Sequence, residues 1–183
     1  MANHKPKSYF EWGAGGSTRW IAAWASEKAI SVDNFKPWCD KVLRDPVVKC
    51  MTEEGIFSQG CITPKDAQTG WGKMQHSDDN EKVSKAFINS IDTYNHSRYD
   101  TILVDGRFRQ ACALKALHYM DENSILLFHD FWSRWEKYDF VLEYFNPIGR
   151  SRTIGVLRRK PDEELPSDWK EAYLRYSTLQ FQN

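Results

Sequence analysis

The chain has 183 residues, of which 41% are hydrophobic and 27% are charged. This length and apolar content predict one domain, residues 1–183, with a full hydrophobic core. The 25 Lys and Arg residues balance the 25 Asp and Glu residues, so nothing in the charge predicts nucleic acid or an anionic membrane as a partner. No segment approaches the roughly 18 apolar residues of a membrane span, and no apolar leader begins the chain. We therefore expect a soluble, cytoplasmic protein.

The four cysteines are spread along the chain without the CxxC spacing of zinc or redox sites. Each lies in or beside an apolar segment, as buried thiols do in a reducing compartment. The sequence therefore predicts neither a disulfide nor a structural zinc site for Cys39, Cys50, Cys61 and Cys112.

Apolar runs of strand length alternate along the chain with amphipathic segments of helix length. We expect strands at 9–12, 29–32, 61–63, 101–104 and 124–128, and a last one in "TIGVLRR" from Thr153. We expect helices at 17–26, 37–49, 81–95, 108–119 and 135–144, and a long polar loop at 64–80. Repeated strand–helix units predict an α/β fold, in which helices cover both faces of a mostly parallel sheet.

Polar residues follow several of the predicted strands. Asp33 ends the second strand, Asp105, Gly106 and Arg107 follow the fourth, and His129 and Asp130 follow the fifth. Ligands of such sheets bind beyond the carboxyl ends of the strands. Aspartates there can also be helix N-caps, but the whole set favours a ligand site.

The first strand leads into a helix through three glycines in the segment "YFEWGAGGSTRWIAAW". Gly13, Gly15 and Gly16 allow a tight turn and a close approach of the backbone to a ligand. Asp33, twenty residues beyond Gly13, is placed to accept hydrogen bonds from ribose hydroxyls. A nucleoside-containing cofactor is therefore expected.

The dinucleotide fingerprint GxGxxG is incomplete here, because its third glycine falls at Thr18. Glu11 stands two residues before Gly13. Its carboxylate would repel a pyrophosphate but attract an ammonium or sulfonium group. The cofactor expected from these residues is cationic.

With "EWGAGG" as its first motif, the sequence resembles the class I S-adenosylmethionine-dependent methyltransferases over nearly its whole length. The resemblance implies a Rossmann-like fold with an antiparallel C-terminal strand and S-adenosyl-L-methionine as cofactor. It also implies that the glycines contact the methionine part, Asp33 the ribose and the segment from Asp66 to Trp71 the adenine. The implied cofactor-binding residues are Glu11, Gly13, Gly15, Gly16, Ser17, Thr18, Asp33, Asp66 and Trp71.

Within that superfamily, "LVDGRFRQACALKAL" and "ILLFHDFW" are similar to small O-methyltransferases of polysaccharide and glycan modification. This similarity implies a sugar or glycan hydroxyl as acceptor. Only eight residues precede the first predicted strand, where many members carry a helical extension. The short start suggests either a minimal enzyme or a module of a longer polypeptide that includes glycosyltransferases.

A sugar hydroxyl has a high pKa, so a base or a metal ion must take its proton during methyl transfer. The candidates are Asp105, His129 and Asp130, and we favour His129 as the base. The alternative is a divalent metal, Mg or Mn, held by Asp105 and Asp130. Arg107 either orients the acceptor or pairs with a carboxylate.

Aromatic residues follow the fifth strand directly. Phe131, Trp132 and Trp135 are candidates for stacking against the acceptor, although Trp135 fits equally well as part of the core. Trp20 and Trp24 are expected in the core, at the spacing of one helix face.

Three functions remain open from these residues. The first is a sugar or glycan O-methyltransferase. The second is a metal-dependent, catechol-type methyltransferase of small molecules. The third is a non-catalytic binding module with the same fold.

Overall fold

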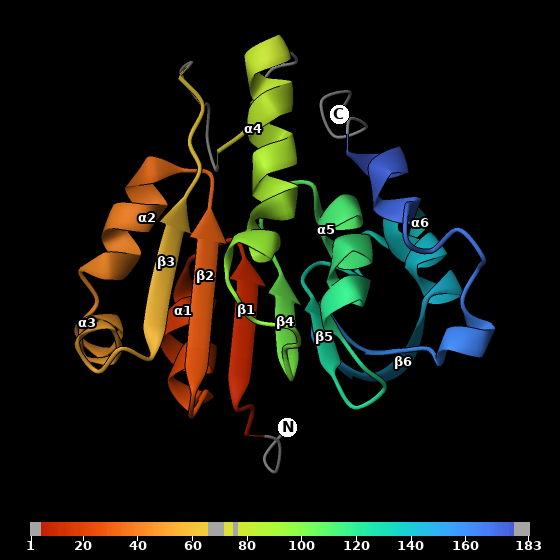
Figure 1. The fold of residues 1–183 in the computed structure, drawn as a ribbon, viewed down its shortest axis with the longest axis horizontal. Helices are drawn as coiled ribbons and strands as arrows, with labels where there is room; N and C mark the ends of the chain where they lie inside the picture. Colours follow the sequence, from red (N-terminus) through yellow and green to blue (C-terminus); the bar gives the residue numbers. More distant parts are fainter. Residues whose placement is uncertain (1–4, 66–71, 75–76, 178–183) are drawn as a thin grey trace.

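The computed structural model describes residues 5–65, 72–74 and 77–177. Their strands form one seven-stranded sheet, in the order β3-β2-β1-β4-β5-β7-β6 (Figure 1). The five strands β1 to β5 run parallel, β7 pairs antiparallel with β5, and β6 pairs antiparallel with β7. The strands are β1 Ser8–Trp12, β2 Lys28–Asp33, β3 Phe57–Cys61, β4 Thr101–Val104, β5 Ile125–Phe128, β6 Phe145–Ser151 and β7 Ile154–Arg159.

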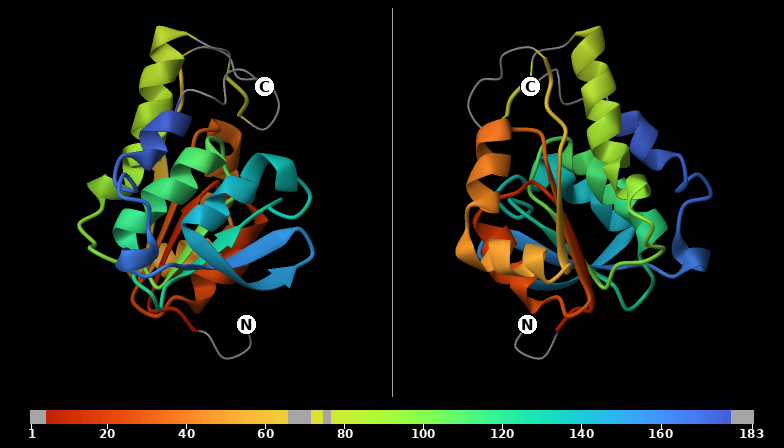
Figure 2. Two further views of the ribbon diagram at one scale, coloured as in Figure 1. Left: turned by 90° about the vertical axis from the view of Figure 1, so that its right-hand side faces the viewer. Right: turned by 60° about the vertical axis from the view of Figure 1, so that its left-hand side comes forward.

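Helices cover both faces of the sheet, as Figure 2 shows in its right-hand view. The α-helices α1, α2 and α3 lie on one side, and α4 and α5 lie on the other. The α-helices are α1 Gly16–Ile21, α2 Lys36–Leu43, α3 Pro46–Glu53, α4 Asp78–Ile88, α5 Arg109–Ala116 and α6 Trp135–Tyr138. The 3₁₀ helices are η1 Ala22–Trp24, η2 Asn89–Thr93, η3 Leu117–Tyr119, η4 Asp139–Glu143, η5 Asp162–Glu164 and η6 Ala172–Tyr176.

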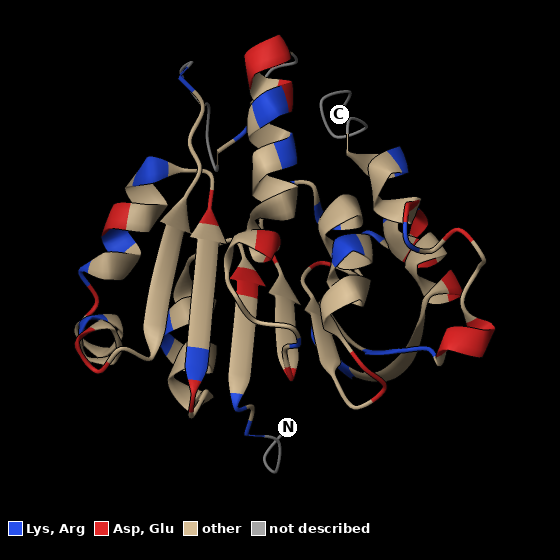
Figure 3. Cartoon of the chain, viewed as in Figure 1, with Lys and Arg blue, Asp and Glu red and all other residues tan. Residues whose placement is uncertain are grey.

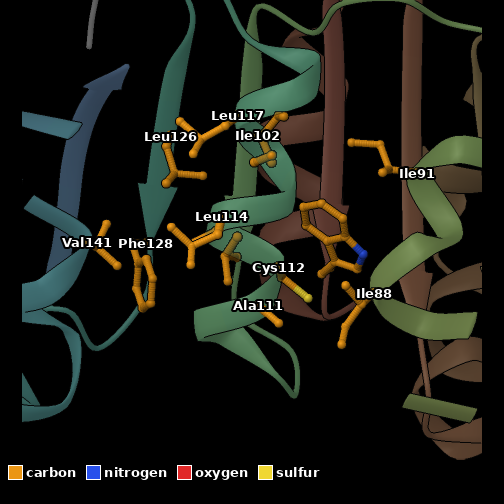
Figure 4. Packing of buried hydrophobic residues seen from close by; sticks show 14 of the residues in the cluster. Ile88, Ile91, Ile102, Ala111, Cys112, Leu114, Leu117, Leu126, Phe128 and Val141 are labelled. Carbon is orange, nitrogen blue, oxygen red and sulfur yellow. The ribbon is translucent and has the colours of Figure 1, made fainter. Parts of the chain in front are cut away.

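The sequence "TILV" of β4 shows how one strand serves two cores. Ile102 and Val104 point into the larger core, whereas Leu103 points into the smaller core on the opposite face. Successive side chains of a strand alternate between faces, so a central strand covered on both faces is apolar at most positions. Figure 4 shows Ile102 in the larger core beside Leu114 of α5 and Leu126 of β5.

The predicted α/β class, with a mostly parallel sheet and an antiparallel C-terminal strand, is confirmed. The chain builds outward from β1 to β3, then returns to place β4 on the other side of β1. The carboxyl ends of β1 and β4 therefore border the point where the strand order reverses. Ligands of open α/β sheets bind at such points.

Both edge regions of the sheet differ from prediction. The strand expected at 61–63 lies earlier, at Phe57–Cys61, and has only one buried residue. The strand β6 was not predicted. It contains Pro147 and Gly149, pairs with β7, and is exposed after Phe145. Edge strands tolerate proline and need little apolar alternation.

The helix expected at 37–49 is two helices, α2 and α3. The break falls at Asp45 and Pro46. The Asp45 carboxylate accepts a hydrogen bond from the backbone N–H of Val47, and proline follows at the first helical position. Both features are typical of a helix start.

Two aromatic residues expected in the core lie at the surface. Trp20 is 66% exposed and Trp24 is 53% exposed. The helix α1 ends at Ile21 and continues as a 3₁₀ turn. The buried positions of this segment are Thr18, Ala22 and Ala25. Trp20 and Trp24 therefore share one face of the helix, but it is not the face that packs on the sheet.

The prediction that all four cysteines are thiols is wrong. Cys39 of α2 and Cys61 of β3 form a disulfide, with their Cα atoms 6.1 Å apart. Cys50 and Cys112 are free, the first exposed and the second buried. In the described part of the chain, no helix is long and apolar enough to cross a membrane.

Candidate functional site

The glycine turn joins β1 to α1 against the loop that follows β4. Gly13 has a φ of +104°, and a Cβ there would lie 2.3 Å from the backbone nitrogen of Gly106. The backbone N–H groups of Asp105 and Gly106 both donate to the carbonyl of Trp12. Only glycine fits this close approach. By contrast, a Cβ at Gly15 or Gly16 would meet nothing within 4 Å.

Asp33 binds the same turn from the end of β2. Its Oδ2 accepts from the backbone N–H of Ala14 at 2.7 Å, and its Oδ1 accepts from that of Phe35 at 2.6 Å. Burial raises the pKa of Asp33 to about 6, although the two backbone hydrogen bonds favour the charged form.

Glu11 lies beneath the glycine turn and is fully buried. Its Oε2 accepts from the hydroxyls of Tyr9 at 2.7 Å and Ser17 at 3.1 Å, and its Oε1 accepts from the hydroxyl of Thr18. Thr18 in turn accepts from the backbone N–H of Gly15 at 3.0 Å. Burial raises the pKa of Glu11 to about 7 despite these donors.

This network differs from the arrangement expected from the sequence. Glu11, Ser17 and Thr18 do not line the cavity above the turn. Their polar groups bind one another instead, and so hold Gly15 and the start of α1 in place. Glu11 and Asp33 lie at the carboxyl ends of β1 and β2, which Figure 3 shows in the red of acidic residues.

The ends of β4 and β5 bring an imidazole and two carboxylates together. His129 Nδ1 lies 2.9 Å from Asp105 Oδ1 and 3.4 Å from Asp130 Oδ1. The Asp105 carboxylate beside it raises the pKa of His129, and the opposing effect of partial burial is smaller. The prediction that these three residues converge is confirmed.

Arg109, in the first turn of α5, was not predicted as a site residue. Its Nη1 donates to Asp130 Oδ2 at 2.9 Å and to the carbonyl of His129 at 3.1 Å. Its Nη2 donates to the carbonyl and to the Oδ1 of Asp105, at 3.0 and 3.2 Å. The guanidinium therefore joins the ends of β4 and β5. Asp105 precedes α5, so the i, i+4 rule for helices does not apply to this pair, and no local pattern in the sequence indicated it.

Asp130 has an unusual backbone conformation and a lowered pKa. Its φ is +59°, a left-handed conformation that is rare outside glycine. Burial alone would raise its pKa, but Arg109, His129 and Arg134 hold the pKa of Asp130 below its ordinary value. Strained backbone of this kind is concentrated at functional sites.

One cavity of about 470 Å³ joins the glycine turn and Asp33 to the groups at the ends of β4 and β5. A volume of this order suits a small-molecule ligand. The expected residues Arg107, Asp105, His129 and Asp130 contribute to its wall together with the glycine turn and Asp33. Its lining residues are Gly13, Ala14, Gly15, Gly16, Asp33, Asn34, Trp38, Asp105, Gly106, Arg107, Arg109, His129, Asp130 and Arg134.

The pair Asp105 and Asp130 does not fit a divalent metal in this arrangement. The Arg109 guanidinium already lies between the two carboxylates and contacts both. A divalent ion at that place would meet a fixed positive charge. In the described part of the chain, no group of three or more His, Cys, Asp or Glu residues is arranged to hold a metal ion.

The aromatic residues after β5 do not line the cavity. Phe131 is fully buried and packs on Phe128, with Gly155 beneath its ring. Its predicted role as an acceptor platform is therefore wrong. The rings of Trp132 and Trp135 stack with their centroids 5.3 Å apart, and Trp135 is 40% exposed. They form a separate aromatic pair beside the cavity-lining segment.

The predicted adenine-binding residues Asp66 and Trp71 lie outside the described residues. Nearby, the structure adds Asn34 and Trp38, which the sequence did not single out. The Asn34 side chain donates to the carbonyl of Gly72 at 2.9 Å. Both residues line the cavity on the side of α2.

The fold has counterparts among solved structures. The crystal structure of a methyltransferase-like protein from Silicibacter pomeroyi DSS-3 superposes with a TM-score of 0.72 at 21% identity, covering 95% of this chain and 88% of the other. The methyltransferase MycE of the mycinamycin pathway, solved with Mg and SAH, superposes with a TM-score of 0.50 at 10% identity, covering 96% of this chain and 49% of the other. No protein-family model and no curated protein matches this chain.

These comparisons and the sheet order define the architecture. The protein has the Rossmann-like fold found in methyltransferases, with its cavity at the carboxyl ends of the parallel strands.

Proposed function

We propose that the protein is an S-adenosyl-L-methionine-dependent O-methyltransferase. The observation that carries this proposal is a single cavity that joins a glycine turn and Asp33 to the His129–Asp105 pair. The first half of the cavity suits a nucleoside cofactor, because Asp33 can accept hydrogen bonds from ribose hydroxyls. The open space above Gly15 and Gly16 leaves room for the methionine part.

When bound, the cofactor supplies an electrophilic methyl group on a sulfonium. His129 and Asp105 act on the acceptor. With Nδ1 beside Asp105, the other ring nitrogen of His129 takes the proton of the acceptor hydroxyl as its oxygen bonds to the methyl carbon. The cofactor would supply the methyl group and would leave as its neutral thioether, S-adenosylhomocysteine. Asp105 stabilises the protonated imidazole that results.

We propose a hydroxyl of a sugar or glycan unit as the acceptor. The motifs "LVDGRFRQACALKAL" and "ILLFHDFW" support this class, and so does the polar wall of the cavity. An alcohol needs a base, and the His129–Asp105 pair provides one. The stacked pair Trp132 and Trp135 offers a flat apolar surface outside the cavity for a longer glycan.

The metal-dependent alternative is less well supported, because Arg109 lies between the two candidate ligands. Turnover is therefore expected to survive exhaustive chelation. Activity that disappears with chelator and returns with Mg or Mn would favour the metal-dependent enzyme instead.

Incubation with radiolabelled S-adenosylmethionine and a panel of sugars, glycans, catechols and peptides tests the proposal. We expect label in a sugar or glycan. Label only in catechols or peptides would contradict the acceptor class. Cofactor binding without transfer to any acceptor in the panel would favour a binding module, and no cofactor binding would contradict the proposed enzyme.

A further inference from the structure

A second, smaller hollow of about 190 Å³ opens beside the large cavity. Four of its lining residues, Gly106, Arg107, Arg109 and Arg134, also line the large cavity, so the two spaces are neighbours. The glycine turn and Asp33 do not line the small hollow, which extends instead toward α6. Its remaining lining residues are Gln110, Lys137 and Tyr138.

The charge of this hollow is one-sided. Arg107, Arg109, Arg134 and Lys137 contribute four cations to its wall, and no carboxylate lines it. The chain as a whole has equal numbers of basic and acidic residues. The excess of positive charge is therefore local to this hollow and does not follow from the composition of the chain.

Two carboxylates, Asp105 and Asp130, pair with two of these cations, Arg109 and Arg134. Arg109 pairs with Asp105 and Asp130, and its five N–H donors are all used in this way and on backbone carbonyls, so it contributes charge to the hollow. Arg134 lies 3.3 Å from Asp130 Oδ2. Within the described residues, Lys137 forms no ion pair with a carboxylate. Burial, and then the neighbouring charges of Arg109 and Arg134, lower the pKa of Arg107. Cations that repel one another in this way are stabilised by a bound anion.

The start of α5 adds to the positive potential. This eight-residue helix begins at Arg109, and its N-cap residue, Phe108, is in the left-handed conformation with φ +55°. No described side chain caps its first turn. The hollow is lined by residues that flank this helix start, including Gly106 and Gln110. Free N–H groups and the helix dipole favour an anion at such an end.

We propose that this hollow binds an anionic group of the acceptor, a phosphate or a carboxylate, and thereby places the acceptor hydroxyl at His129. The inference rests on the proposed function and narrows its acceptor to an acidic sugar or a sugar phosphate. Arg109 connects the hollow to the proposed base, because it lines the hollow and also donates to the backbone carbonyl of His129. The anion would bind in the hollow, and the rest of the acceptor would reach His129 in the adjoining large cavity.

The balanced net charge does not conflict with a charged acceptor. Net charge governs the attraction of polyanions over long distances. One phosphate or carboxylate needs only a local site, because Arg and Lys bind it through short, charge-assisted hydrogen bonds.

Calorimetric titration of the protein with inorganic phosphate, in the presence of saturating S-adenosylhomocysteine, tests this site. We expect saturable binding, at least tenfold weaker in Lys137→Glu and largely kept in Lys137→Arg. The control is Lys82→Glu, because Lys82 is an exposed lysine of α4 outside the hollow. A parallel titration with acetate distinguishes the two anion classes, of which the tighter binder identifies the acceptor group.

Two results would overturn the inference. The first is equal phosphate affinity in the wild type and Lys137→Glu, with both proteins folded by circular dichroism. The second is displacement of phosphate by S-adenosylhomocysteine, which would assign the anion site to the cofactor. Failure of the proposed function is a separate result, because it would appear as absent binding of S-adenosylhomocysteine in phosphate-free buffer.

Discussion

His129 Nδ1 lies 2.9 Å from Asp105 Oδ1, although the two residues are 24 positions apart in the chain. The sheet register explains this contact. Val104 of β4 is paired with Phe128 of β5, so the residue that follows each strand lies beside the other. Parallel pairing at this register therefore builds the proposed base.

Replacement of either partner is expected to reduce methyl transfer. His129→Asn and Asp105→Asn should each lower kcat by about 10²- to 10⁴-fold, the usual contribution of a general base. The dissociation constant of S-adenosylhomocysteine should change little, because these groups act on the acceptor. Single-turnover kinetics and calorimetry separate the two effects. Full activity in His129→Asn would exclude the imidazole base.

The contact between His129 and Asp105 should also determine how kcat depends on pH. His129 is a base only when it is neutral, so kcat should rise with pH through its pKa. Asp105 raises that pKa above the ordinary value of about 6.5. In Asp105→Asn the inflection should move to lower pH. An inflection unchanged by this variant would show that another group titrates.

Asp33 is expected to determine cofactor affinity. Loss of a charged hydrogen bond to ribose costs about 1.5 to 3 kcal/mol, so Asp33→Asn should weaken binding roughly tenfold or more. Wild-type affinity should also fall below about pH 6, because protonation removes the charged acceptor. Asp40→Asn, on the outer side of α2, is the matched control. Unchanged affinity in Asp33→Asn would remove Asp33 from the site.

Glu11 should make stability depend on pH. Its pKa is raised from 4.5 to about 7 in the folded protein. Glu11 therefore contributes up to about 3 kcal/mol to the free energy of unfolding below pH 4.5. This contribution is lost as the pH rises through about 7. Glu11→Gln has no titrating group at this position. Its free energy of unfolding should therefore rise relative to that of the wild type as the pH increases from 5 to 8. Urea unfolding measures the difference, with exposed Glu53→Gln as control.

The disulfide is expected to stabilise the part of the fold that carries Asp33. It closes a loop with a sequence separation of 22 between α2 and β3. Loss of such a cross-link costs about 3 kcal/mol in the chain-entropy description. Cys39→Ser and Cys61→Ser should therefore lower the melting temperature by similar amounts, whereas Cys50→Ser should not. A thiol titration that finds four free cysteines in the native protein would contradict the pairing.

Much of the site was predictable because its signals are local. A glycine turn after an apolar strand, and polar residues at the next strand ends, are adjacent in sequence to the elements that position them. Asp33, Asp105 and His129 were found in this way. Phe131 was misassigned because it follows the same strand end but packs inward on Phe128. Sequence position alone does not tell which way a loop residue turns.

The sequence by itself determined the alternation of strands and helices from β1 to β5, the glycine turn after the first strand and the placement of carboxylates at one edge of the sheet. These follow from hydrophobic period and turn chemistry, which act over a few residues. Only the tertiary structure decided that Arg109 joins Asp105 to Asp130, that Cys39 meets Cys61, and that Glu11 lies buried under the turn. These contacts depend on how separate elements pack, and packing sets distances that no single stretch of sequence contains.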